Sequence, residues 1–121
     1  MAFKWSEYLD LAQFLYNNGS NINQVTQESA YRSAISRAYY AVFCYAREYA
    51  FINYGFITTK STNIHKEVEN QFRRKGLLKI ADNLRDLRIW RNQCDYDNEV
   101  DDISSMIQKS IIKAQEILSR I

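Results

Sequence analysis

The fold is decided by residues 26–54, which read TQESAYRSAISRAYYAVFCYAREYAFINY. Apolar residues recur along this stretch at intervals of three and four positions, in two files. The first file is Ala30, Ala34, Ala38, Ala41, Tyr45, Tyr49 and Ile52, and the second is Tyr31, Ile35, Tyr39, Val42 and Ala46. This spacing predicts one long helix that is apolar over much of its circumference and lies at the centre of a helical bundle.

Shorter helices are expected on both sides of this central helix. The first helix is expected at about residues 5–16. The third runs from the cap candidates Ser61, Thr62 and Asn63 to Gly76, and the fourth covers about residues 77–94. The last begins after the Asp97–Asn98 cap region. Gly19 and Gly55 are expected to cap the ends of the first two helices, and Glu99, Asp101 and Asp102 to lie in the first turn of the last. Since the connections are short, neighbouring helices are expected to pack antiparallel.

The composition supports an all-α fold. The 121 residues, 46% of them hydrophobic, suit one domain covering 1–121 and are far too apolar for a disordered chain. There is no proline and there are three glycines, whereas most β folds need turn residues about every 8 to 12 positions. The prediction is an antiparallel up-and-down bundle of about five helices.

The sequence also predicts where the chain resides. The segment MAFKWSEYLD lacks the apolar region of a signal peptide, and no stretch approaches the ~20 apolar residues of a membrane span. We therefore expect a cytoplasmic protein without membrane contact, in which Cys44 and Cys94 are reduced thiols.

The net charge of +2 is unevenly distributed. Residues 60–91 contain nine basic and four acidic side chains, residues 92–121 contain three basic and six acidic ones, and residues 1–59 balance. A basic middle segment suits phosphate binding, and the alternative is a solvated helix surface of mixed charge.

Several common sites are excluded. The chain has no glycine-rich phosphate loop, no Cys/His cluster with zinc spacing and only one histidine, so a multi-histidine metal site cannot form within one protomer. No metal and no other cofactor is expected.

Two residues are unusual for a plain bundle. Arg91 lies four and seven positions after Leu87 and Leu84, on the apolar side of its helix, with Arg88 one turn earlier and Asn92 next to it. An inward guanidinium needs an anion or a polar network, and the alternative is an arginine that extends to solvent or neutralises carbonyls at the helix end. His65 is a candidate acid or base, or else a surface or capping residue.

The sequence resembles the HEPN superfamily (higher eukaryotes and prokaryotes nucleotide-binding), in its small stand-alone prokaryotic branch. The segment SAISRAYYAVF at residues 33–43 is similar to the family's central helix. The later matches, in the family's order and spacing, are His65 with Phe72 and then Leu84, Arg88, Arg91, Asp95 and Tyr96. The resemblance covers roughly residues 5–120.

The resemblance implies a helical bundle that dimerises about its central helices and binds RNA. Many members are metal-independent endoribonucleases with an arginine, often followed by Asn, Asp or His, and a histidine four to six residues later. Arg91 and Asn92 match the first half of this motif, but Asp95, Tyr96 and Asp97 stand where the histidine is expected. Asp and Tyr, with reference pKa values of about 4 and 10, replace imidazole poorly at neutral pH, and helix capping is the simpler role for Asp95 and Asp97. His65 could replace the missing imidazole.

The resemblance leads to three hypotheses about function. The leading hypothesis is a homodimer of the toxin–antitoxin or defence kind that binds RNA or nucleotide phosphates through Arg88, Arg91, Asp95 and Tyr96, with a degenerate ribonuclease motif. The second is an active endoribonuclease toxin that uses Arg91 and Asn92 with His65 or Tyr96. The third is a non-catalytic module that pairs with a small nucleotidyltransferase. Dimerisation is also suggested by the aromatic side chains of the central helix, Tyr39, Tyr40, Phe43, Tyr45 and Tyr49.

Overall fold

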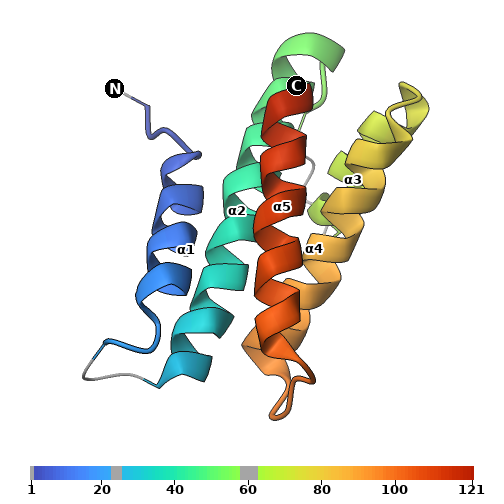
Figure 1. The fold of residues 1–121 in the computed structure, drawn as a ribbon. Helices are drawn as coiled ribbons and strands as arrows, with labels where there is room; N and C mark the ends of the chain where they lie inside the picture. The colour runs from blue at the N-terminus through green and yellow to red at the C-terminus, as the bar shows by residue number, and fades with distance from the viewer. Residues whose placement is uncertain (1, 23–25, 58–62) are drawn as a thin grey trace.

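The computed structural model describes residues 2–22, 26–57 and 63–121, and the regular secondary structure in these ranges is helical (Figure 1). The helices are α1 (Glu7–Asn18), α2 (Gln27–Tyr54), α3 (Ile64–Arg74), α4 (Leu78–Tyr96) and α5 (Ile103–Arg120). The predicted all-α bundle of five helices is confirmed. The cap candidates Ser61 and Thr62 lie outside the described residues.

Helix α2 is the centre of the bundle, as its two apolar files predicted. It packs against each of the other four helices, and its small residues Ala34, Ala38, Ala41 and Ala46 are fully buried. The helix starts at the Thr26 cap, whose side chain accepts a hydrogen bond from the Ser29 backbone N–H. It ends at Gly55, which has a φ of 66° in the left-handed region that glycine adopts without strain.

The expectation that all neighbouring helices are antiparallel is wrong for α2 and α3. His65, at the start of α3, lies beside Phe43 in the middle of α2, and Phe72, near its end, lies beside Tyr54 at the end of α2. The two helices therefore run in the same direction (Figure 1). The connection of nine residues, 55–63, can span up to about 30 Å, whereas the return from Tyr54 to Phe43 along α2 is only about 17 Å.

Two helix ends also differ from expectation. Gly19 has a φ of −57° and is not a left-handed cap; a Cβ there would lie 3.0 Å from the Tyr31 ring, so the position is restricted by packing. Helix α5 begins at Ile103, with Asp102 as its cap accepting from the Ser105 backbone N–H, and not after 97–98. The acids at 99, 101 and 102 consequently precede its first turn.

The core encloses most of the aromatic side chains that had suggested a dimer. Tyr39 and Phe43 are buried, and Tyr40 and Tyr49 pack partly buried against the core. Cys44 and Cys94 are both buried free thiols. No helix in the described ranges is both long enough and apolar enough to cross a membrane.

Candidate functional site

Arg91 faces inward, as the spacing from Leu84 and Leu87 predicted. The residue is 7% exposed, and its guanidinium carbon lies 5.2 Å and 5.3 Å from the ring centres of Tyr39 and Tyr40 on α2. Its only ion pair within the described residues is with Asp95, at 3.8 Å, and its buried Nε has no hydrogen-bond partner there. The aromatic rings compensate part of the cost of burying this charge.

His65 joins the same group of side chains through Tyr39. The Tyr39 hydroxyl and Nδ1 of His65 are 2.5 Å apart, and the imidazole lies against Phe43 with 4.3 Å between ring centres. The structure thus brings Arg91 and His65 to one tyrosine, although they come from different helices. We call Tyr39, Tyr40, His65 and Arg91 the arginine site.

The protonation of His65 follows from its surroundings. Burial, and then the positive charges of Arg91, Arg88 and Arg47, lower the pKa of His65, so the ring is neutral at pH 7. Burial raises the pKa of Tyr39 far above neutrality, so its phenol keeps its proton, and we assign that proton to the hydrogen bond with Nδ1 of His65. The remaining imidazole proton is therefore on Nε2, which makes that nitrogen a hydrogen-bond donor.

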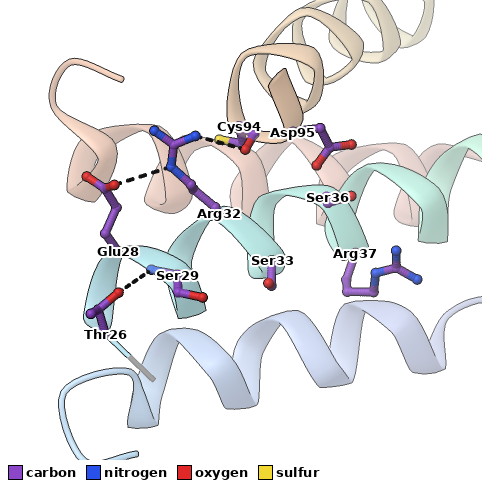
Figure 2. Close-up of a pocket in the computed structure, with 9 residues that line it drawn as sticks. All are labelled: Thr26, Glu28, Ser29, Arg32, Ser33, Ser36, Arg37, Cys94 and Asp95. Atoms are coloured by element: carbon purple, nitrogen blue, oxygen red, sulfur yellow. Dashed lines mark hydrogen bonds and ion pairs between the residues drawn. The ribbon is translucent and has the colours of Figure 1, made fainter. Parts of the chain in front are cut away.

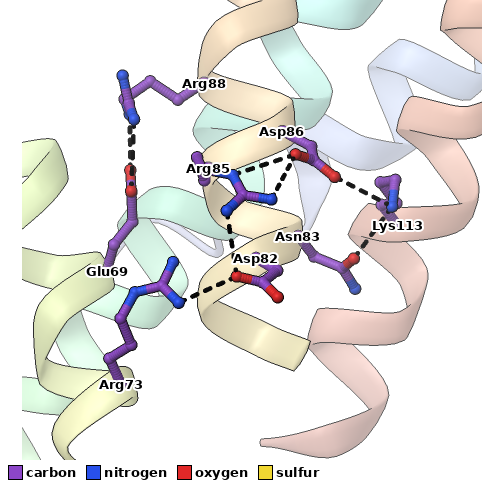
Figure 3. A network of polar contacts seen from close by, with 8 residues as sticks. All are labelled: Glu69, Arg73, Asp82, Asn83, Arg85, Asp86, Arg88 and Lys113. Atoms are coloured by element: carbon purple, nitrogen blue, oxygen red, sulfur yellow. Dashed lines mark hydrogen bonds and ion pairs between the residues drawn. The ribbon is translucent and has the colours of Figure 1, made fainter. Parts of the chain in front are cut away.

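Arg88, in contrast, is engaged by a carboxylate within the fold. Its Nε donates to Oε2 of Glu69 at 2.6 Å, and its Nη2 donates to Oε1 of the same carboxylate at 3.4 Å (Figure 3). Glu69 is 5% exposed, so this ion pair is largely removed from water. Arg88 therefore connects α4 to α3, and its charge is already compensated.

The other predicted residues lie near the end of α4. Asn92 is partly buried, and Tyr96 is 76% exposed at the last position of the helix. Asp95 is an anion beside Arg91, so its position is that of a counter-ion that a phosphate would have to displace.

Much of the basic middle segment is paired in the same way. Arg73 and Arg85 contact Asp82, and Arg85 also contacts Asp86 (Figure 3). Lys79 contacts Glu116. This arrangement agrees with the alternative of a helix surface of mixed charge. Within the described parts of the chain, no group of three His, Cys, Asp or Glu side chains could hold a metal ion.

Arg32, which was not among the predicted site residues, lies at the end of α4. It donates hydrogen bonds to the carbonyls of Cys94, Asp97 and Asn98 at 3.0, 2.6 and 3.1 Å. It also forms an ion pair with Glu28 on its own helix at 3.4 Å (Figure 2). These bonds satisfy carbonyls that a helix end leaves without partners.

The partners of the predicted arginines were also missed. Glu69 could have been noticed because it lies four positions after His65, on the same face of α3. Tyr39 and Tyr40 belong to the SAISRAYYAVF segment, but their contacts with Arg91 depend on how α2 and α4 pack. No local signal in the sequence gives that packing.

Comparison with known proteins adds little to this picture. No family model matches the chain, and no solved structure matches it. A protein of Methanocaldococcus jannaschii, named only as uncharacterized, is 28% identical over an alignment of 115 positions, and the match covers 81% of this chain and 63% of that protein. The chain thus spans less than two thirds of this relative, and the HEPN resemblance stays a prediction from the sequence.

Proposed function

We propose that this chain is a HEPN-type protein that binds RNA or nucleotide phosphates, with Arg91 as the central contact and a degenerate ribonuclease motif. In this proposal it acts as a homodimer of the toxin–antitoxin or defence kind. The observation that carries the proposal is the state of Arg91, a buried guanidinium with an unpartnered Nε and its carboxylate at 3.8 Å. A buried cation short of hydrogen bonds is costly to maintain, and a phosphate bound to its terminal N–H groups would compensate its charge.

The chemistry of the guanidinium supports phosphate as the ligand. The rings of Tyr39 and Tyr40 hold the Arg91 side chain in place, and its planar fork of N–H donors matches two phosphate oxygens. Because the side chain is already ordered, little conformational entropy is lost on binding. The exposed ring of Tyr96, at the end of the same helix, is available for stacking on a base.

The protonation of His65 favours binding over cleavage. With Nδ1 accepting from Tyr39, Nε2 carries a proton and can donate to a phosphate oxygen. A general base would need a free nitrogen, and a general acid would need a protonated ring, which the lowered pKa of His65 disfavours at neutral pH.

The proposal is tested by RNA binding at low ionic strength, measured by fluorescence anisotropy with a labelled single-stranded oligonucleotide. Arg91→Ala should weaken binding at least tenfold, because it removes charge-assisted hydrogen bonds worth about 1.5–3 kcal/mol. Asp95→Asn should strengthen binding several-fold, because it removes the competing anion beside Arg91.

Arg120→Ala is the matched control, since it removes one positive charge at the far end of α5. Circular dichroism must show that all three variants are folded. Equal affinities of wild type and Arg91→Ala would refute the proposed site.

An active endoribonuclease is the second candidate, favoured by the contacts that both Arg91 and His65 make with Tyr39. Arg91 would stabilise the phosphorane and His65 would move protons. This function predicts growth arrest on expression, abolished by Arg91→Ala, and RNA cleavage by the purified protein without added metal. If the purified protein cleaves no RNA, the active endoribonuclease is refuted and only the binding function remains. Pairing with a nucleotidyltransferase is a further expectation, tested by co-purification with the product of an adjacent gene.

A further inference from the structure

A hollow of about 360 Å³ lies between the first half of α2 and the end of α4 (Figure 2). This volume is near the small end of the range for ligand sites. Ser29, Ser33 and Ser36 line it from α2, and Asp95 lines it from α4. Since Asp95 also pairs with Arg91, the hollow borders the arginine site.

The charges around the hollow leave one cation uncompensated. Arg32 is paired with Glu28 and donates to three carbonyls, and Asp95 is directed to Arg91. Arg37 also lines the hollow, and it forms no ion pair with any carboxylate of the residues described. Of the two arginines that line the hollow, Arg37 is therefore the one whose charge is available to an anion.

Arg37 is held by aromatic rings, in the same manner as Arg91. Its guanidinium carbon lies 4.9 Å from the ring centre of Tyr8 on α1 and 5.5 Å from that of Tyr40. Stacking uses the faces of a guanidinium and leaves the N–H donors at its edge free for phosphate oxygens. Both arginines are thus ordered before a ligand binds.

Tyr40 also sets an upper limit on the distance between the two arginines. Arg91 lies 5.3 Å and Arg37 lies 5.5 Å from its ring centre, so their guanidinium carbons are at most about 11 Å apart, the sum of these distances. At a separation near this limit, a single mononucleotide phosphate on Arg91 would leave Arg37 unused. A strand that carries one phosphate on each arginine would use both.

We propose that Arg37 is a second phosphate contact, and that the ligand is therefore a single RNA strand of at least two nucleotides lying from Arg91 into the hollow. This inference depends on the proposed function of Arg91. The serine hydroxyls of the hollow can donate to and accept from ribose 2′-hydroxyls, which DNA lacks.

The test compares a short oligouridylate, the DNA of corresponding sequence and uridine monophosphate as probes of the full chain. Arg37→Ala should weaken oligouridylate binding about five- to tenfold and lower the slope of log affinity against log salt by about 0.7, the value for one phosphate contact on a single strand. The affinity of the Arg37→Ala variant for uridine monophosphate should stay within about twofold of wild type. The DNA should bind at least about fivefold more weakly than the RNA.

The controls separate this inference from the proposed function. If Arg91→Ala weakens RNA binding and Arg37→Ala leaves it unchanged, the second contact is wrong while the site at Arg91 stands. If wild type and Arg91→Ala bind RNA equally, the proposed function itself fails. Equal binding of DNA and RNA overturns the ribose contact. Arg37→Gln, which removes the charge but keeps part of the aliphatic stem, replaces Arg37→Ala if that variant does not fold.

Discussion

His65 is the only histidine in the chain, so its titration can be followed without ambiguity. Its pKa is lowered in the folded protein by burial and by Arg91, Arg88 and Arg47. Between the lowered pKa of the folded state and about pH 6.5, the unfolded chain, whose histidine pKa is near 6.5, therefore binds more protons than the folded one. The free energy of unfolding should consequently fall as the pH is lowered from 7 to 5.

His65→Gln should remove most of the decrease in the free energy of unfolding between pH 7 and pH 5, because carboxylates titrate mainly below this pH range. Thermal melts of wild type and variant at intervals of pH measure the difference. Long-range proton–nitrogen spectra of the imidazole should show the neutral form with its proton on Nε2. A proton on Nδ1 would contradict the hydrogen bond proposed from Tyr39.

Single residues could be assigned to a face from the sequence, but not to a partner. The intervals from Leu84 and Leu87 correctly predicted that Arg91 faces inward. The same reasoning selected Arg88 for phosphate binding, although Glu69 compensates it. Periodicity reports the face of one helix, whereas an ion pair between α3 and α4 also requires their relative register.

At the scale of elements, Arg32 is expected to stabilise the connection between α4 and α5. Arg32→Ala removes three hydrogen bonds from a charged donor to carbonyls and should lower the free energy of unfolding by about 2 kcal/mol. Urea unfolding measures this loss, and amide exchange should accelerate at residues 95–98. Arg32→Lys should recover part of the stability, and a variant as stable as wild type would show that these bonds contribute nothing.

The direction of the helices was only partly predictable. Short connections correctly predicted antiparallel packing of α3 with α4, where Arg73 meets Asp82 and Arg88 meets Glu69. The longer connection from α2 permits either direction, and the parallel one brings His65 to the middle of α2 beside Phe43. The sequence therefore predicted the helices but could not show that His65 would approach Arg91.

For the whole molecule, we expect a homodimer on the basis of the family resemblance. The central aromatic side chains no longer support it, because the chain's own core covers most of them. Exposed apolar side chains such as Phe14, Phe51 and Ile52, at 57%, 61% and 70% exposure, offer other surfaces for contact. Light scattering at micromolar concentration should give twice the mass of the 14.3 kDa chain, and a monomer would contradict this expectation.

The unsatisfied nitrogen of Arg91 has a consequence for the molecule as a whole. Replacing a buried ion pair by apolar side chains of similar volume is often neutral or stabilising, by about 1–4 kcal/mol, and the partner of Arg91, Asp95, is exposed and would not be left as a buried unpaired charge. Arg91→Met should therefore raise the melting temperature or leave it unchanged, while RNA binding is lost. Selection for stability alone would not maintain an arginine at position 91. If relatives keep it, the residue is therefore required for something other than folding. A variant that melts well below wild type would instead make Arg91 part of the scaffold.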